Sequence, residues 1–295
     1  MWLIDRGRGT EASGIACGLM FFWLIRGHAI EGLRWYERIL KLPALPPAAE
    51  SRALVGAVLM WYTQGELERA RTGITRARAL AQDASDLEMI AHVEVLSGHV
   101  EQGVGEVTAA RARFSRSVEA YRTLLIPWGT GSALSSLANV TLAAGDTVEA
   151  ERLLDEATTV LRHAGPYFLT STLYVRAILA VRRGNPDDAI VLVRESLTRI
   201  REIQDRFAFV YALVPLAAAA VLKGDDAWAA RILGARDAVT ERTGATVVDK
   251  SVDDLKEQAE REVRARLGPD RWAQAYAAGR RASIDALLKD IDSVV

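Results

Sequence analysis

A glycine followed by a polar residue recurs along this 295-residue chain at a nearly constant spacing. The intervals between successive glycines are 38, 40, 40, 39 and 40 residues, and the glycines are Gly27, Gly65, Gly105, Gly145, Gly184 and Gly224. Five positions after each glycine stands a small residue: Gly32, Ala70, Ala110, Ala150, Ala189 or Ala229. Nine positions after it stands a large apolar one: Tyr36, Ile74, Phe114, Leu154, Val193 or Leu233. A period of about 20 to 50 residues is typical of solenoids, in which each unit packs only on its neighbours.

Each unit is predicted to be a pair of helices joined at the glycine. Glycine adopts positive φ without a clash at Cβ, so it suits the tight turn that ends the first helix. The second helix begins directly afterwards, because Asp146 and Glu149 have the spacing of a capping box and Pro186 suits a first helical position. The small residue lets the two helices approach closely, and the large one lies a turn later on the same face. The alternating runs that are typical of strands are absent.

The predicted fold class is therefore all-α. We expect a right-handed α-α superhelix of about six helical hairpins over residues 1–243, followed by a helical cap over residues 244–295. The third unit departs from the pattern, because glycines crowd its first helix and Glu101 and Gln102 replace apolar residues. A local break or bend is expected there.

The cap is predicted from its polar helix signals. Thr243-Gly244-Ala245 is expected to end the last repeat, and Ser251 with Asp254 to begin a charged helix that runs to about Leu267. Gly268-Pro269 is expected to form a turn before the next helix, and Ser283 to cap the last one. A solenoid needs such a polar end to cover its last apolar face.

The charge balance and the scarcity of cysteine exclude several classes of protein. With 37 basic and 38 acidic residues the net charge is −1, whereas a domain that holds nucleic acid needs a basic surplus. The single Cys17 cannot form an internal disulfide, which favours a reducing, cytoplasmic setting. The uncharged stretch from Ala12 to Ile25 is shorter than the ~20 residues of a membrane-spanning helix. We expect no contact with nucleic acid, no membrane span, and no metal or cofactor.

The repeat resembles the tetratricopeptide repeat (TPR), whose usual period is about 34 residues. More closely, the chain is similar to the repeat region of bacterial transcription regulators and signalling ATPases of the STAND class, including LuxR-type proteins similar to the maltose regulon activator. The residues that carry this resemblance are Phe22 to His28 with Glu31-Gly32, Trp128-Gly129 with Leu134, Leu137 and Ala144 to Asp146, then Ala229 to Ala235, Leu267 to Pro269, Trp272, Ala275, Tyr276 and Gly279-Arg280. The resemblance implies a sensor and protein-interaction arm beside a nucleotide-switch module.

The switch module itself is missing from the sequence. No phosphate loop of the form G-x-x-x-x-G-K-[ST] occurs, and no helix-turn-helix with a basic recognition helix is apparent. We therefore expect the chain to be a C-terminal fragment, a truncated product or a stand-alone derivative of a larger regulator.

The candidate partner or ligand site lies in the concave groove. By analogy with TPR proteins, residues 13, 10 and 6 positions before each turn glycine point into that groove. The polar residues selected in this way are Arg52, His92, His99, Ser132, Ser135, Asn139 and Tyr211. No catalytic residue is predicted, because the acid pairs Asp187-Asp188, Asp225-Asp226 and Asp253-Asp254 all fall where helices are expected to begin and are interpreted as caps.

We interpret the chain as a non-enzymatic sensor or interaction domain for a protein or peptide partner, or for a small inducer. One alternative is a helical hydrolase or transferase that uses acids and histidines in the groove, which would need strongly perturbed carboxylates. Another is a chaperone adaptor that clamps C-terminal peptides, for which Arg52 and Asn139 are the only candidates. Exposed Trp and Phe side chains in the first unit are expected to cause self-association.

Overall fold

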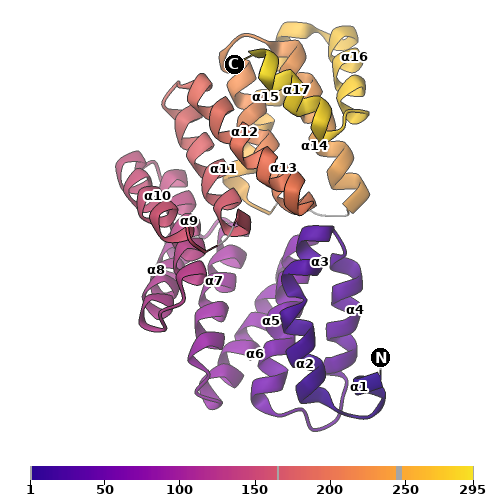
Figure 1. The fold of residues 1–295 in the computed structure, drawn as a ribbon, viewed down its shortest axis with the longest axis vertical. Coiled ribbons are helices and arrows are strands. Elements are labelled where there is room, and N and C mark those ends of the chain that lie inside the picture. Colours follow the sequence, from indigo (N-terminus) through magenta and orange to yellow (C-terminus); the bar gives the residue numbers. More distant parts are fainter. Residues whose placement is uncertain (1, 165, 244–247, 295) are drawn as a thin grey trace.

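The structure, a computed structural model, describes residues 2–164, 166–243 and 248–294. These residues form 17 helices and no strand. The helices stack as hairpins that wind into a superhelix, with the N-terminal unit at one end and the C-terminal helices at the other (Figure 1). The predicted all-α superhelical repeat fold is confirmed.

The helices follow the predicted pairs. After α1 (Trp2–Asp5), the first helices of the six units are α2 (Gly9–Gly18) with α3 (Met20–Arg26), α5 (Pro47–Thr63), α7 (Leu87–Gly103), α9 (Pro127–Ala143), α11 (Pro166–Arg182) and α13 (Arg206–Leu222). The second helices are α4 (Ala29–Leu40), α6 (Leu67–Asp83), α8 (Val107–Thr123), α10 (Thr147–Leu161), α12 (Pro186–Ile203) and α14 (Asp226–Thr243). Only the first unit divides its first helix in two.

The repeated residues have the roles that their spacing predicts. All six turn glycines have positive φ, between 72° and 92°. The small and large residues that follow them are buried in every unit, as Ala150 and Leu154 are in the fourth. In the same unit the Asp146 carboxylate accepts a hydrogen bond from the Glu149 backbone N–H at 3.0 Å. The turn and the close helix contact therefore recur in every unit, whereas a side-chain cap follows the turn only at Asp146 and Asp225.

Of the break or bend expected in the third unit, the break is wrong, because α7 is one continuous helix, and the bend stays a prediction. Its unusual residues all have partners: Glu101 accepts a hydrogen bond from Arg113 at 3.0 Å, and the Gln102 amide donates to Asp249 at 3.1 Å. Gly98 leaves room for the Phe114 ring, since a Cβ at Gly98 would lie 2.6 Å from that ring. These residues serve packing, so the helix needs no interruption.

The first helices line the inside of the superhelix. Neighbouring inner helices contact each other in four successive pairs: α5 with α7, α7 with α9, α9 with α11, and α11 with α13. At the end of the array, α3 of the first unit lies beside α13 of the sixth and contacts it (Figure 1). The turn at Gly27 meets the sixth unit too, because a Cβ there would lie 3.1 Å from the Thr243 side chain. The array therefore closes end to end around its axis.

Three helices cover the end of the array. α15 (Lys250–Leu267) packs on α13 and α14, α16 (Pro269–Arg280) packs on α14, and α17 (Ile284–Val294) packs on α12. Ser283 caps α17 as predicted, with its Oγ accepting from the Ala286 N–H at 3.2 Å. The prediction that Ser251 caps α15 is wrong: Asp249 is the cap and accepts from the Ser251 backbone N–H at 2.9 Å. The predicted stop at Gly244-Ala245 lies outside the described residues.

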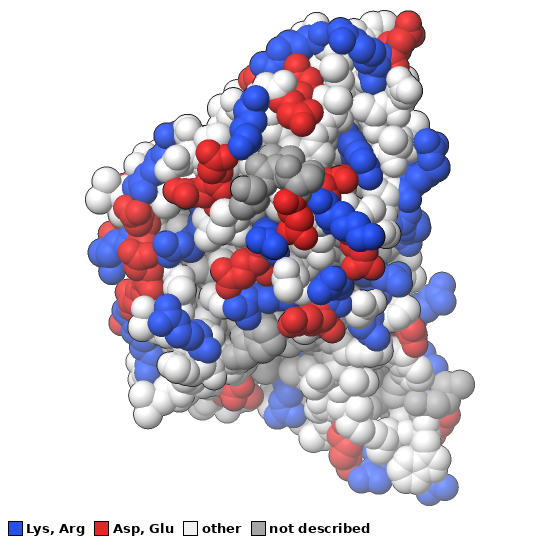
Figure 2. All heavy atoms as spheres, turned by 45° about the horizontal axis from the view of Figure 1, so that its top comes forward, with Lys and Arg blue, Asp and Glu red and all other residues white. Residues whose placement is uncertain are grey.

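Charges of both signs are interspersed over the face shown in Figure 2. Many of them pair between neighbouring helices, as Arg183 does with Glu151 at 2.7 Å. Such exposed pairs contribute only about 0–1 kcal/mol each. Within the described ranges, no helix is both long enough and apolar enough to cross a lipid bilayer.

Candidate functional site

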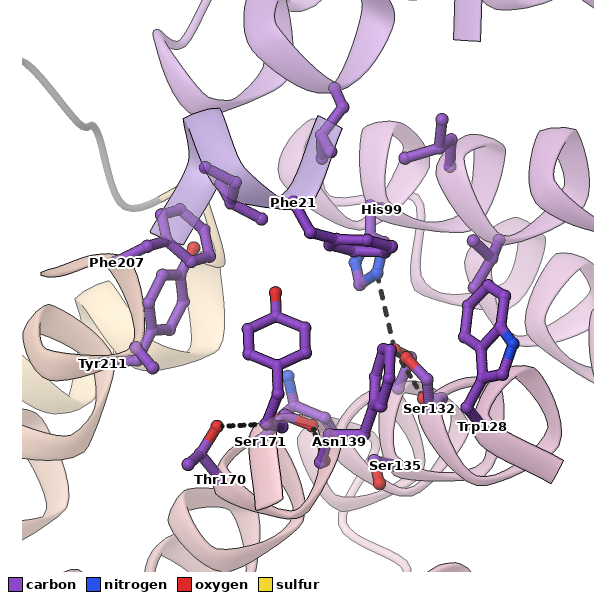
Figure 3. A pocket seen from close by; sticks show the side chains of 18 of the residues that line it. Phe21, His99, Trp128, Ser132, Ser135, Asn139, Thr170, Ser171, Phe207 and Tyr211 are labelled. Carbon is purple, nitrogen blue, oxygen red and sulfur yellow. Dashed lines mark hydrogen bonds between the residues drawn. The ribbon is translucent and has the colours of Figure 1, made fainter. Parts of the chain in front are cut away.

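A pocket lies on the axis of the superhelix, where the inner helices converge. Its cavity volume is about 180 Å³. The walls come from α3, α5, α7, α9, α11 and α13, with Tyr121 from α8 and Asp249 from the segment before α15. In Figure 3, Phe21 extends from α3 over the cavity, facing Trp128 and Ser132 on one side and Phe207 and Tyr211 on the other.

Six of the seven residues selected from the sequence line this pocket: His92, His99, Ser132, Ser135, Asn139 and Tyr211. Arg52 does not. It lies on α5 near Cys17, because α5 packs against α2 of the first unit. That these six contact a ligand stays a prediction.

Both histidines of the pocket make contacts within the fold. His92 Nδ1 donates to the Glu88 carbonyl at 2.9 Å, one turn earlier on α7. His99 Nε2 lies 3.4 Å from the Ser136 hydroxyl, and its ring packs edge-on against Phe114, with centroids 5.0 Å apart. Burial without a nearby charge lowers the pKa of His99 to about 4, so this imidazole carries no charge at neutral pH.

Two of the polar residues hold helices together rather than face the cavity with free groups. The Ser135 hydroxyl lies 2.6 Å from that of Thr172, a bond between α9 and α11. The Asn139 amide donates to the carboxylate of Asp249, which also accepts from Gln102. Asp249 is therefore both the cap of α15 and a buried acceptor for two inner helices. Ser132 makes no such side-chain bond among the described residues.

Among the described residues, nine Phe, Tyr and Trp side chains line the pocket, and of these only Tyr211 was predicted from the sequence. Trp128 stacks on Phe168 with ring centroids 5.2 Å apart. Phe21 meets Trp128 edge-on at 6.2 Å and Tyr167 at 5.5 Å. Phe207 lies 5.0 Å from Tyr211 on the opposite side. Offset and edge-on pairs of this kind are the favoured aromatic geometries.

A signal for these residues is present in the repeat. An aromatic residue stands seventeen positions before the turn glycine in each of the last three units: Trp128, Tyr167 and Phe207. This offset lies in the first turn of the inner helix, one turn before the positions that were searched. Phe21 has no such counterpart, since it reaches the pocket only because α3 contacts α13.

Five of the seven tyrosines line the pocket: Tyr62, Tyr121, Tyr167, Tyr174 and Tyr211. Burial raises the pKa of each of them above the usual value, so all five hydroxyls are neutral. The hydroxyls of Tyr167 and Tyr174 have no hydrogen-bond partner among the described residues. They can donate to, or accept from, a molecule in the cavity.

Asp205 is the second carboxylate of the pocket and was also missed. Asp205 is the cap of α13, and its carboxylate accepts a hydrogen bond from the Ala208 N–H at 2.8 Å. Only 2% of the Asp205 surface is exposed. Burial raises the pKa of Asp205 to about 6, although the backbone hydrogen bonds from Ala208 and Phe207 lower it. Asp205 forms no ion pair with any described residue, and no Lys or Arg lines the pocket.

The site can therefore bind an apolar or aromatic group and offer it a few polar contacts. Its acids and histidines do not gather into a metal centre: no group of three or more His, Cys, Asp or Glu among the described residues could hold an ion. A cavity of roughly 150 Å³ accommodates benzene, so a substituted benzene ring fits this volume.

Comparisons with known proteins identify the fold. No protein-family model matches the sequence, and no curated protein matches it. Among solved structures, a Rap protein complexed with competence and sporulation factor has a TM-score of 0.60 and 12% identity, over 86% of this chain and 77% of that one. BtubC of P. vanneervenii has a TM-score of 0.50 and 14% identity, over 83% and 92%. PilF of Pseudomonas aeruginosa has 0.47 and 15%, over 90% and 97%.

At identities of 12% and 14%, the similarities to the Rap protein and to BtubC show a shared fold and nothing further. They agree with the repeat geometry, and the chain is a helical-repeat protein with a TPR-like solenoid fold.

Proposed function

We propose that this chain is a sensor repeat domain that binds a small inducer, or a short segment of a partner protein, in the pocket on the superhelix axis. The observation that carries the proposal is the composition of the walls. Phe21 comes from the first unit and Phe207 from the sixth, so a bound molecule touches both ends of the array.

This arrangement gives a ligand a means of changing the shape of the array. The contact between α3 and α13 closes the superhelix beside the pocket. A molecule held between Phe21 and the rings of the fourth to sixth units binds only when that contact is made. Because it binds the closed array better than an opened one, it shifts the population towards closure. A partner protein bound to the outer helices would then respond to the change in shape.

The regulatory setting is part of the proposal. We infer a cytoplasmic regulator of the STAND or LuxR kind, in which residues 1–243 sense and residues 244–295 cap the array, without direct contact with nucleic acid. The resemblance of the repeat residues supports this setting. The structural likeness to a Rap protein that was captured with competence and sporulation factor supports the idea that such a fold holds a signal.

The proposal is tested with a neutral aromatic probe, 2-phenylethanol. We expect weak, saturable binding to the full chain by isothermal titration calorimetry. Ser132→Phe should weaken that binding by about tenfold or more, because the new ring occupies the cavity that Ser132 lines. Ser115→Phe on α8 is the matched control, since Ser115 is exposed and lies outside the pocket.

Equal affinities for the two variants would mean that the probe binds elsewhere, and the pocket would lose its role. Absence of binding to the unmodified chain would also contradict the proposal. Circular dichroism of both variants shows whether the added ring disturbs the fold.

One observation supports the alternative that the chain is a hydrolase or transferase. Asp205 is a buried carboxylate with a raised pKa, which a helical hydrolase or transferase would need. We favour binding because neither His92 nor His99 hydrogen-bonds to Asp205: their partners are Glu88 and Ser136. The chaperone clamp has less support, since Arg52 lies outside the pocket and Asn139 is bonded to Asp249.

Self-association through the first unit stays a prediction. Trp2 is 55% exposed and Phe22 is 50% exposed, with Ile15 and Ile30 also at the surface, whereas Trp23 is buried. Apolar groups that gather on one unit favour contact between copies. We expect the elution volume on a sizing column to fall as protein concentration rises. A single monomer peak at every concentration would contradict this.

A further inference from the structure

Among the described residues, the lining of the pocket includes acidic side chains but no basic one, although Arg182 interacts with Asp249 from outside the lining. None of the lining residues is Lys or Arg, while two of them, Asp205 and Asp249, are carboxylates. His99 is neutral at physiological pH because burial lowers its pKa to about 4. Whatever binds there meets negative charge inside a largely apolar cavity, where charge interactions are stronger than in water.

The two carboxylates differ in how far the fold satisfies them. Asp249 accepts from the side chains of Gln102, Asn139 and Ser251 and from backbone N–H groups. Asp205 accepts from backbone N–H groups alone. A buried carboxylate without a cation is costly, and a bound cation would relieve that cost.

Other charged groups near Asp205 do not neutralise it. Arg201, Arg206 and Arg242 line a separate, shallow cavity that Asp205 also borders. None of them forms an ion pair with Asp205, and Arg201 pairs with Asp285 at 3.3 Å instead. On the pocket side, the neighbours of Asp205 include Tyr167, whose hydroxyl is neutral. The Asp205 carboxylate therefore borders the pocket without an ion-pair partner among the described residues.

The aromatic walls suit the same ligand. Trp128, Phe168 and Tyr167 line the cavity and pack against one another. Phe21 extends over the cavity and meets Trp128 edge-on (Figure 3). Ring faces attract cations, most strongly when the cation is removed from water. The unpaired hydroxyls of Tyr167 and Tyr174 can accept hydrogen bonds from an N–H group.

We propose that the pocket selects an organic ammonium ion with a flat apolar body, its charged nitrogen directed to Asp205 and its body held among Phe21, Trp128 and Phe168. This inference rests on the proposed function, because it names the chemical class of the inducer or peptide group that the same pocket binds. A primary amine on an aromatic ring system is the simplest member of the class.

An anionic ligand is the main competing occupant, because α9, α11 and α13 all begin at the pocket and helix N-termini attract anions. The N–H groups of α13, however, are already capped by Asp205. An anion would also face Asp205, which forms no ion pair with any described residue, and no Lys or Arg lines the pocket. The observations therefore favour a cation.

The test uses three probes that each carry one phenyl ring on a short chain: 2-phenylethylammonium, 2-phenylethanol and 3-phenylpropionate. By calorimetry near pH 8, the ammonium should bind the full chain about tenfold more tightly than the alcohol, and the propionate more weakly than either. As the pH falls through about 6, Asp205 takes up a proton and the advantage of the ammonium should disappear. The amine itself stays charged over this range, because its pKa is close to that of lysine.

Asp205→Asn assigns the effect to one carboxylate. Asparagine still caps a helix, so the variant should fold, bind 2-phenylethanol unchanged, and bind ammonium and alcohol equally at both pH values. A pH dependence that remained in this variant would show that Asp205 is not its cause and would overturn the assignment. Asp146→Asn is the matched control: Asp146 caps α10 in the same way but is exposed and outside the pocket, so it should keep the tenfold preference.

The outcomes separate the two proposals. If the alcohol binds and the ammonium binds no better, or the propionate binds best, the ammonium inference is overturned and the sensor pocket stands. If none of the probes binds, both the proposed function of the pocket and the ammonium inference are contradicted. Should Asp205→Asn not fold, the order of the three probe affinities on the unmodified chain at pH 8 decides between a cationic and an anionic ligand.

Discussion

Gly279→Ala should lower the free energy of unfolding by about 3 kcal/mol, at the upper end of the usual cost of overpacking. α14 and α16 touch backbone to backbone, so that a Cβ at Gly279 would lie 1.8 Å from the Arg231 carbonyl oxygen. On the other helix, a Cβ at Gly234 would lie 2.1 Å from the Tyr276 carbonyl oxygen. No side-chain rotation relieves such a contact, so the helices must separate and the packing of the cap loosens.

Urea unfolding followed by circular dichroism measures this loss. Gly14→Ala is the control, because Gly14 lies within α2 and a Cβ there meets nothing within 4 Å. Alanine favours the helix, so the control should gain about 0.5–1 kcal/mol. An unchanged unfolding midpoint for Gly279→Ala would contradict the close approach of α14 and α16.

Asp249→Ala should cost about 4 kcal/mol of stability. The change removes the cap of α15, worth about 1 kcal/mol. It also leaves the amides of Gln102 and Asn139 buried without their acceptor, at about 1–3 kcal/mol each. The loss should be concentrated in the cap, with amide hydrogen exchange in α15 accelerating before that of α5.

Asp146→Ala isolates the capping share of that effect. Asp146 caps α10 through the Glu149 N–H but accepts from no other helix, so its replacement should cost about 1 kcal/mol. Thermal unfolding of the two variants provides the comparison. If both lose the same amount, then Asp249 is only a cap and does not join the inner helices to the C-terminal segment.

The repeat could be predicted from the sequence because its causes are local. Positive φ at Gly145 and the capping bond from Asp146 are decided within a few residues, and the positive φ recurs at all six turn glycines. The polar residues that line the pocket could be selected by counting back from the same turn glycines. Arg52 was selected in the same way but does not line the pocket, because α2 packs over its helix, and a contact between units cannot be seen from offsets within one.

The rest of the pocket depends on contacts between distant residues. Phe21 lies over Trp128 only because the superhelix closes, and closure depends on the accumulated rotation of all the units. Asp205 and Asp249 were each predictable as residues beside a helix start, but their burial inside the cavity was not. The chemistry of the site therefore emerges at the level of the whole array.

The meeting of α3 with α13 has one more consequence, which concerns how this chain can evolve. An open stack of hairpins lengthens or shortens freely, because each new member meets only the two beside it. Here a duplicated or deleted hairpin would carry the two ends past one another and destroy the enclosure between them. We expect the number of hairpins to be held constant wherever this arrangement is inherited, while the outer helices are free to diverge.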